Sequence, residues 1–373
     1  MGFWLGRKSA PPAARPFVPA WLATGEEQGG LARGYAAMLD EVYRKNPVGQ
    51  RCVRLVAGAV GGLKLYGDGE AGDAAAKLAS GALMEQLAAA LLLHGNGYVR
   101  LAADGNDRPA KLFALRPERV SIAADKDGWP TGFVYRAGPR SERIARVDPL
   151  GRAQVAHLKA LSPAEDHYGM GCLDAAIGAA SVHNRATVWN KALLDNAARP
   201  SGALVYAPED GSSLGAEQFD RLSRELAEQF SGSGNAGRPL LLEGGLKWQA
   251  MSLTPADMDF VALKESAARD IALAFGVPPV LVGLPGDATY ANAREAGRAL
   301  YRQTVLPLAG QIAEGLSAML SDWLGPVAIK ADSDALSELA EDRALLWQQA
   351  EAASFITRAE KRDLLGYAPG EGE

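Results

Sequence analysis

The chain has 373 residues, of which 48% are hydrophobic, and its 39 basic and 44 acidic side chains give a formal net charge of −5. This apolar content can bury a sizeable core, which excludes a disordered chain, and the length is sufficient for two or three domains. The acidic balance provides no overall attraction to nucleic acid or to anionic membranes, so any contact with DNA must be local or transient.

The first 30 residues are rich in proline and contain no continuous apolar run of signal-peptide length. They are predicted to form a flexible N-terminal arm. The most apolar helical stretch of the chain, LMEQLAAALLL, carries Glu85 and Gln86 and is too short to span a bilayer. We therefore expect no membrane partner.

The next part of the chain is predicted to combine helices with short strands. Asn46 before Pro47 is typical of an N-cap followed by proline at the first helical position. A second helix is predicted from about Asp73 to Leu93. From Gly97 to Leu161, the β-type runs YVRLA, KLFAL, VSIA, GFVYR and QVAHLKAL alternate with turn signals. This pattern predicts a small α+β body with a meander-like sheet.

A second module is predicted between two helices. The first of these helices runs from about Cys172 to Ala197 and ends at Arg199-Pro200. A strand (GALVY), a helix, a flexible turn (SGSGNAG) and two strands (PLLLE and LKWQAM) then predict a β-α-β-β module. The second helix lies within TPADMDFVALKESAARDIALAF and stops at Gly276, before Pro278-Pro279.

A loop and a long helix follow. Asn292, with Glu295 three residues later, is predicted to begin the helix as a capping box. Pro307 cannot donate to the carbonyl of Gln303, so we expect a kink there. The tail from Asp334 to Leu365 is predicted to be helical, with a break near Ser354. Apolar residues recur at helical spacing along the long helix, at Tyr301, Val305, Leu308, Ile312, Leu316, Met319 and Trp323.

Motifs for catalysis are missing from the sequence. It contains no GxSxG, no HExxH, no Walker lysine motif and no GxGxxG between a strand and a helix. The two cysteines, Cys52 and Cys172, lie far apart and favour reduced thiols over a disulfide or a zinc site. We therefore expect no enzymatic activity, no catalytic residues, no metal and no cofactor. The histidines have no ligand spacing; they are His94, His157, His167 and His183.

Three arginines, Arg294, Arg298 and Arg302, repeat every four residues along the first turns of the long helix. Positive charge near a helix N-terminus opposes the macrodipole, so a partner should offset it. Pairing with carboxylates, within the chain or between subunits, is the favoured interpretation. Direct contact with phosphate and a plain solvated face remain open. The carboxylates considered are Asp257, Asp259 and Asp270.

An ordered series of segments covers about residues 30 to 325. It consists of NPVGQRCVRLVAGAVGGLKLY, ALLLHGNGYVRL, LFALRPERVSI, HYGMGCLDAAIGAA, NAARPSGALVY, GRPLLLEGGLKWQAMSLTPAD and ARDIALAFGVPPVLVGL, with DATYANAREA. No single piece is a catalytic signature, but the order is specific. The series resembles the portal (head-to-tail connector) proteins of tailed double-stranded DNA phages, including the versions carried by gene transfer agents.

The resemblance implies an α+β portal fold with a wing, a two-helix stem, a β-α-β-β clip and a short helical crown. The implied regions are a flexible arm at 1–30, the N-terminal part of the wing at 31–171, the first stem helix at 172–198, the clip at 199–253, the second stem helix at 254–276, the tunnel-loop region at 277–291, the kinked wing helix and a strand at 292–330, and the crown or C-terminal tail at 331–373.

The resemblance further implies a dodecameric ring at one capsid vertex, through which the large terminase packages DNA and DNA is later ejected. Other implied partners are the major capsid protein and a head-tail adaptor protein, in a virion or gene transfer agent particle that assembles in the cytoplasm of a bacterial host. Contact with double-stranded DNA would be transient and independent of sequence. A non-catalytic scaffold protein and, less favoured, a DNA-processing enzyme with an unrecognised site remain as alternatives. The DNA-facing tunnel loop would consist of Gly283, Leu284, Pro285, Gly286, Asp287, Ala288, Thr289 and Tyr290.

Overall fold

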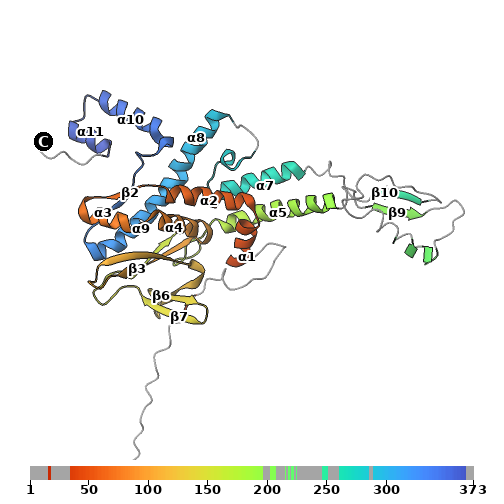
Figure 1. Ribbon diagram of the computed structural model, residues 1–373, viewed down its shortest axis with the longest axis horizontal. Coiled ribbons are helices and arrows are strands. Elements are labelled where there is room, and N and C mark those ends of the chain that lie inside the picture. Colours follow the sequence, from red (N-terminus) through yellow and green to blue (C-terminus); the bar gives the residue numbers. More distant parts are fainter. Residues whose placement is uncertain are drawn as a thin grey trace, which may run out of the picture. The chain divides into compact units, whose positions relative to one another are not determined.

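The computed structural model describes residues 16–17, 34–195, 202–206, 246–250, 260–284 and 289–366, together with residues 215, 217–218, 220–221 and 224. The chain divides into two compact units (Figure 1). The first contains Met1–Ala176 and Ala272–Glu373, and the second contains Ile177–Ile271. Helices and antiparallel strands are both present, which confirms the predicted α+β class.

The first unit begins with helices whose ends follow local sequence signals. The side chain of Asn46 accepts hydrogen bonds from the backbone N–H groups of Val48 and Gly49, both at 3.0 Å, which confirms the predicted N-cap. The helices of this region are α1 (Tyr35–Leu39), the π-helical turn η2 (Asp40–Arg44) and α2 (Pro47–Gly61).

The single helix expected from Asp73 to Leu93 is wrong, because two helices occupy this stretch. The first helix ends with Ala79 as its C-cap. The Ser80 hydroxyl then caps the second helix by accepting from Leu83 N–H at 3.3 Å. A Cβ on Gly81 would lie 2.4 Å from the Gly61 carbonyl oxygen, so α2 approaches the second helix closely. Gly95, with φ of 78°, ends that helix in the predicted place. The two helices are α3 (Gly69–Leu78) and α4 (Gly81–His94).

No single helix of the described residues is both long and apolar enough to cross a membrane. Helices α3 and α4 are long and apolar enough only when they are taken together, and the pair is bent by 65°.

The expected strands are present, but they form two sheets instead of one meander. One has the order β1-β5-β6-β7 and the other β4-β3-β8, with antiparallel pairing throughout. Strand β8 returns to pair with β3, where Asn96 lies opposite Lys159. Strand β7 was missed because only one of its six residues, Ile144, is buried. The strands are β1 (Pro16–Phe17), β3 (Asn96–Ala103), β4 (Pro109–Leu115), β5 (Val120–Ala124), β6 (Pro130–Ala137), β7 (Arg140–Ala145) and β8 (Val155–Lys159), and the short 3₁₀ helix η3 (Pro117–Arg119) precedes β5.

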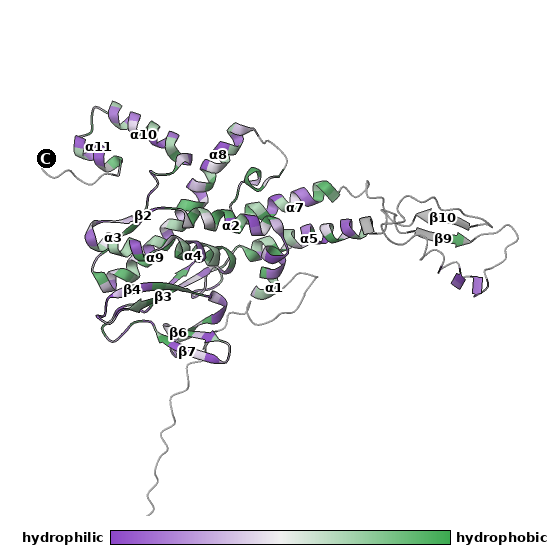
Figure 2. Cartoon of the chain, in the orientation of Figure 1, coloured by the Kyte–Doolittle hydropathy of each residue, from purple (hydrophilic) through white to green (hydrophobic). Residues whose placement is uncertain are grey.

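The core of the first unit has two parts. Between the sheets lies a cluster of buried side chains from Tyr98, Val120, Ile122, Phe133, Ile144, Val155 and Tyr168. Helices α2, α4 and α9 (Leu306–Leu324) form a layer over the sheets (Figure 1). The apolar colouring of α4 in Figure 2 reflects its position in this layer. Ile312, Leu316 and Met319 of α9 are buried, as their spacing predicts.

The long helix contains a change of hydrogen-bonding pattern. Helix α8 (Tyr290–Leu300) leads into a π-helical turn, η6 (Tyr301–Val305), and then into α9. Pro307 has no N–H to donate, and the π-turn lies immediately before it. The irregularity is therefore at the predicted place, whereas the bend itself remains a prediction.

The C-terminal part adds a two-stranded sheet and a helical tail. Strand β11 (Ile329–Ala331) pairs with β2 (Leu65–Gly67), a contact that the sequence did not reveal. The break near Ser354 is confirmed. The tail contains η7 (Ser337–Leu339), α10 (Ala340–Ala352) and α11 (Arg358–Leu364).

The second unit contains most of two helices and one pair of strands. Trp189 of α5 (Leu173–Asp195) stacks on Phe260 of α7 (Phe260–Ala274), with ring centroids 4.2 Å apart. Strand β9 (Gly202–Tyr206) pairs with β10 (Leu246–Ala250). The predicted strand PLLLE lies outside the described residues, and the predicted helix before it is described only in part.

Candidate functional site

Helix α7 ends in a Schellman motif, and the short segment that leads to the predicted loop follows it. Gly276 has φ of 65°, its N–H donates to Leu273 O at 3.0 Å, and the N–H of Val277 donates to Ala272 O at 2.9 Å. Val277 is buried. The glycine and the following prolines therefore end the helix sharply, as the sequence predicts, and the chain continues into η5 (Pro279–Val282).

Thr304, in the long helix, fixes the chain at Gly276 by a hydrogen bond. Its hydroxyl, in the π-turn η6, donates to the Gly276 carbonyl at 2.7 Å. A Cβ on Gly276 would lie 2.9 Å from that hydroxyl oxygen. Glycine thus permits both the positive φ and the close approach. The sequence analysis missed this bond, because nothing in the local pattern links residues 28 positions apart.

The predicted tunnel loop is shorter than expected at its C-terminal end. Thr289 is the N-cap of α8, and its hydroxyl accepts from Asn292 N–H at 3.2 Å, so the predicted N-cap at Asn292 is wrong. Threonine can satisfy the same free N–H groups from an earlier position. Tyr290 is consequently the first residue of α8 and is 84% exposed. Gly283, with φ of 78°, ends η5 and precedes Leu284, whereas Pro285, Gly286, Asp287 and Ala288 lie outside the described residues.

The arginine stripe of α8 faces carboxylates of α10. Arg294 Nη1 lies 2.9 Å from Glu341 Oε1, and Arg298 Nη2 lies 2.5 Å from Glu341 Oε2. Arg302 Nη1 and Arg298 Nε each lie 3.8 Å from a carboxylate oxygen of Asp342. The stripe is therefore neutralised by the start of the C-terminal helical tail.

Arg298 is the centre of this group. Its side chain is only 15% exposed, and its Nη1 also bonds Glu295 at 3.0 Å. The hydrogen bond that Arg298 donates to Glu341, more than any other contact, raises the pKa of Arg298. The Nε atom is buried and, among the described residues, makes no hydrogen bond.

Pairing of the stripe with carboxylates of the same chain is confirmed, but with other partners than those considered. Asp257 and Asp259 lie outside the described residues, and Asp270 belongs to the second unit. Glu341 lies 43 residues from Arg298, beyond the range of helical spacing rules. A sequence signal was nevertheless present, since Glu341-Asp342 is an acidic pair within the predicted helical tail.

The scattered histidines include two that meet in a buried polar network. Asn96, which is fully buried, donates to the carbonyls of Gly169 at 2.9 Å and His94 at 3.2 Å. Its Oδ1 accepts from Gly169 N–H at 2.8 Å, and His157 Nε2 is 3.0 Å away. Because the backbone N–H orients the amide, His157 must carry its proton on Nε2. Burial lowers the pKa of His94 to about 4 and that of His157 to about 3.

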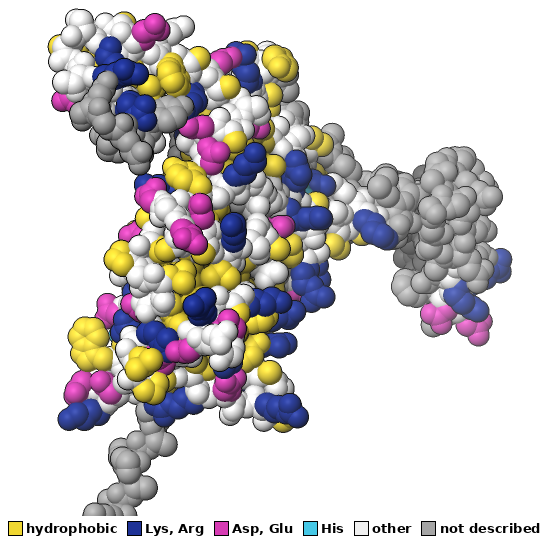
Figure 3. Space-filling view, turned by 60° about the vertical axis from the view of Figure 1, so that its left-hand side comes forward, with side chains coloured by type: hydrophobic (Ala, Val, Ile, Leu, Met, Phe, Trp, Pro, Cys, Tyr) yellow, Lys and Arg dark blue, Asp and Glu magenta, His cyan; other side chains and the backbone are white. Residues whose placement is uncertain are grey.

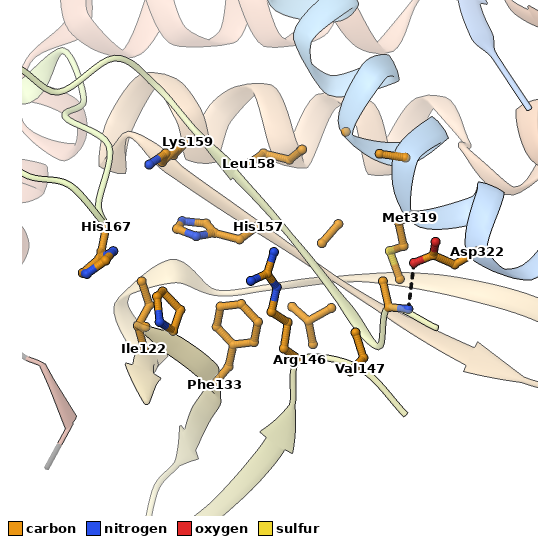
Figure 4. Close-up of a pocket in the computed structure, with 16 residues that line it drawn as sticks. Ile122, Phe133, Arg146, Val147, His157, Leu158, Lys159, His167, Met319 and Asp322 are labelled. Atoms are coloured by element: carbon orange, nitrogen blue, oxygen red, sulfur yellow. Dashed lines mark hydrogen bonds between the residues drawn. The ribbon is translucent and has the colours of Figure 1, made fainter. Parts of the chain in front are cut away.

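A cavity of about 420 Å³ opens beside this network, between the sheets and α9. Figure 4 shows Arg146 rising into it near Phe133 and His157, and shows Asp322 accepting from Ala153 N–H at 3.1 Å. Basic side chains thus lie over an apolar floor. The part of the chain that the structure describes holds no group of three or more His, Cys, Asp or Glu residues that could bind a metal.

Residues 47–366 match the family model described as phage portal protein. The chain belongs to the phage portal protein family. Two relatives are uncharacterised proteins of Rickettsia bellii and Rickettsia felis. The first is 39% identical over 343 residues, covering 87% of this chain and 88% of its own, and the second is 38% identical over 346 residues, covering 88% of each.

Solved structures also match. A chain from the virion of a native gene transfer agent (GTA) particle is 41% identical, with a TM-score of 0.70, over 96% of this chain and 97% of its own. A chain from the neck of a native GTA particle with C12 symmetry is 40% identical, with a TM-score of 0.68, over the same shares. An HK97 family phage portal protein from Corynebacterium diphtheriae is 17% identical, with a TM-score of 0.55, over 81% of this chain and 96% of its own, and it supports the portal fold alone.

Portal proteins are structural and non-enzymatic as a family. This agrees with the expectation that the chain is not an enzyme. The portal family also accounts for a chain whose polar groups, where described, serve mainly in helix caps, ion pairs and buried structural networks.

Proposed function

We propose that the chain forms the ring-shaped DNA conduit of a virion or gene transfer agent particle and joins its head to its neck or tail. The observation that carries this proposal is the identity of 40% with a chain from a GTA neck of C12 symmetry, over 96% of this chain. A closed ring of identical subunits, with twelve copies, is the assembly that this similarity supports.

We further propose a division of the subunit into stem, clip, wing and crown. Residues 172–198 and 254–276 are the stem helices, and 199–253 form the clip. The wing contains 31–171 and 292–330, and the tail from 331 is the crown. Support for this division comes from the contact pattern, in which Ile177–Ile271 forms a unit separate from the rest of the chain.

The proposed partners are those of a packaging conduit. The subunit would contact double-stranded DNA transiently, and the ring would bind the large terminase, the major capsid protein and a head-tail adaptor protein during assembly in the host cytoplasm. A conduit must avoid the counterion release that makes basic proteins hold DNA. Twelve copies, each with a charge of −5, carry roughly −60, which disfavours such adhesion. Figure 3 shows basic and acidic side chains interspersed on the face in view.

The ring prediction has a direct test. Native mass spectrometry of the purified chain is expected to show a closed assembly with a mass of about twelve times the subunit mass of 39.2 kDa. Electron microscopy of the same sample should show annular particles. A monomer at every concentration measured would contradict the proposal and favour a scaffold protein.

The proposed tunnel loop can be tested by adding charge. Replacing Gly286 and Asp287 with lysine is expected to leave ring assembly intact and to reduce DNA packaging, because two phosphate-binding charges per subunit are added where DNA should slide. Packaging is measured as DNA content per particle. The matched control is Gly310→Lys with Glu314→Lys on exposed positions of α9, which makes the same change in charge. Normal filling by the loop variant would reduce the loop to a connector.

A further inference from the structure

Ion pairs join α8 and the π-turn η6 to the start of α10. We use the name arginine clasp for Arg294 and Arg298 of α8 and Arg302 of η6, together with Glu341 and Asp342 of α10. All five residues belong to the first unit. Helices α8 and α10 are coloured largely as hydrophilic in Figure 2.

Helix α10 has little apolar anchoring of its own. Ala350 is its one buried residue, and the large apolar side chains of Leu345 and Trp347 are 54% and 45% exposed. Most of the packing of α10 in the described chain is with η7 and α11, its neighbours in sequence. Exposed ion pairs contribute about 0 to 1 kcal/mol each and weaken with salt. Arg294 and Arg302, at 54% and 61% exposed, make pairs of this weak kind, whereas Arg298 is 15% exposed and its contacts are the main cost of separating α10 from α8.

The arginines are spaced to follow a phosphate backbone. Positions four apart on a helix rise by about 6 Å, so the three guanidinium groups form a row along one side of α8 and η6. A guanidinium binds carboxylate and phosphate through the same fork of N–H donors. In the present structure a carboxylate bridges two of these groups, because the two oxygens of Glu341 bind Arg294 and Arg298 separately, at 2.9 and 2.5 Å.

The start of the row is next to the proposed tunnel loop. Arg294 lies one turn after Tyr290, the first residue of α8. A phosphate-binding row in this place would hold DNA firmly if its charges were free. The carboxylates of α10 occupy those donors instead.

We propose that the arginine row is a DNA phosphate-binding surface that Glu341 and Asp342 mask by occupying its guanidinium groups. The proposal rests on the proposed DNA conduit, since it takes double-stranded DNA as the ligand. Release of α10 exposes the row and increases the grip on DNA, and closure of the clasp restores sliding. Carboxylates and phosphates thus compete for the same donors.

The test compares isosteric variants of the full chain. Rings carrying Glu341→Gln and Asp342→Asn are expected to bind a duplex of about 30 base pairs about tenfold more tightly than wild type at about 100 mM salt. The plot of log affinity against log salt should become steeper by about 2 to 3, one for each arginine that reaches a phosphate. Fluorescence anisotropy of labelled duplex measures both quantities.

Two controls separate unmasking from other causes. Glu314→Gln with Glu351→Gln removes the same charge from exposed positions outside the clasp and is expected to change affinity less than twofold. Adding Arg294→Gln, Arg298→Gln and Arg302→Gln to the clasp variant should return affinity to the wild-type value. The acidic pair also stabilises the start of α10. If the gain in affinity came only from the loss of this helix stabilisation, replacing the three arginines would not return the affinity to the wild-type value.

Three outcomes of the affinity measurements overturn the proposal: equal affinity of the clasp variant and wild type, an equal gain by the control variant, and a gain that the added arginine substitutions do not reverse. Hydrogen exchange of the wild-type protein gives a second measurement that needs no variant. Saturating duplex should increase exchange of backbone amides in 340–352, and unchanged exchange there also overturns the proposal. The clasp lies within one chain, so these comparisons hold whichever oligomeric state forms, and failure of the ring prediction is seen separately by native mass spectrometry.

Discussion

Replacing Asn96 with alanine is expected to lower the free energy of unfolding by about 3 to 5 kcal/mol. The fully buried amide joins the end of α4 to the segment at Gly169 through bonds of 2.8 to 3.2 Å, and it also orients His157. Its removal leaves the N–H and carbonyl of Gly169 without these partners in a buried place, and each unsatisfied group costs about 1 to 3 kcal/mol. Urea denaturation followed by tryptophan fluorescence measures the loss.

Matched substitutions show whether the hydrogen bonds or the volume matter. Asn96→Asp keeps the shape but loses the amide donors to the carbonyls of Gly169 and His94, so it should be about as harmful as alanine. Asn106→Ala, at an exposed turn, is expected to change stability by less than about 0.5 kcal/mol. Equal stability of Asn96→Ala and wild type would contradict a structural role for the network.

Acidification to about pH 5 is expected to lower the free energy of unfolding by about 4 kcal/mol relative to about pH 7.5. Burial lowers the pKa values of His94 and His157 from 6.5 to about 4 and about 3. Below pH 6.5 the unfolded chain therefore binds protons that the folded chain does not, and stability falls as the pH falls. The stability that these groups contribute is fully present above pH 6.5 and is lost toward pH 4 and 3. Denaturation at a series of pH values measures the slope.

The effect of the histidines is separable from that of the carboxylates. Contacts lower the pKa values of carboxyl groups such as Asp40 and Asp104 below their ordinary value of 3.8, so the stability they contribute is lost in a more acidic range. His157→Gln, which can keep a donor toward Asn96, should reduce the slope between pH 6.5 and 5 by about half. A stability that stays level from about pH 7.5 to about pH 5 in the wild-type protein would show that the histidines do not resist protonation.

Elements with local signals were predicted well from the sequence. The cap at Asn46 and the stops at Gly95 and Gly276 depend on neighbouring backbone groups, and the structure confirms all three. The errors at Ser80 and Asn292 are also local, since in both places a serine or threonine hydroxyl caps the helix instead. An N-cap is harder to predict from a serine or threonine in the sequence, because these residues also occur within helices.

Features that depend on distant pairing were not predictable in the same way. Strand β8 pairs with β3, so the strands form two sheets. No residue pattern in β3 or β8 indicates that these two strands pair. The same holds for the bond from Thr304 to Gly276 and for the pairing of Arg298 with Glu341. For the candidate site, the sequence therefore identified the loop and the arginines but not what holds them.

The π-turn η6 sets the rotational phase between the two halves of the long helix. Each residue of an α-helix turns by about 100°, so in an uninterrupted helix Arg294 would point in about the direction of Ile312, which is buried. A π-turn takes in about one additional residue and so offsets that direction by about 100°. The rotation takes the arginines out of line with the core-facing side of α9. One inserted residue thus lets a single long helix bury an apolar face in one half and present a row of positive charge in the other.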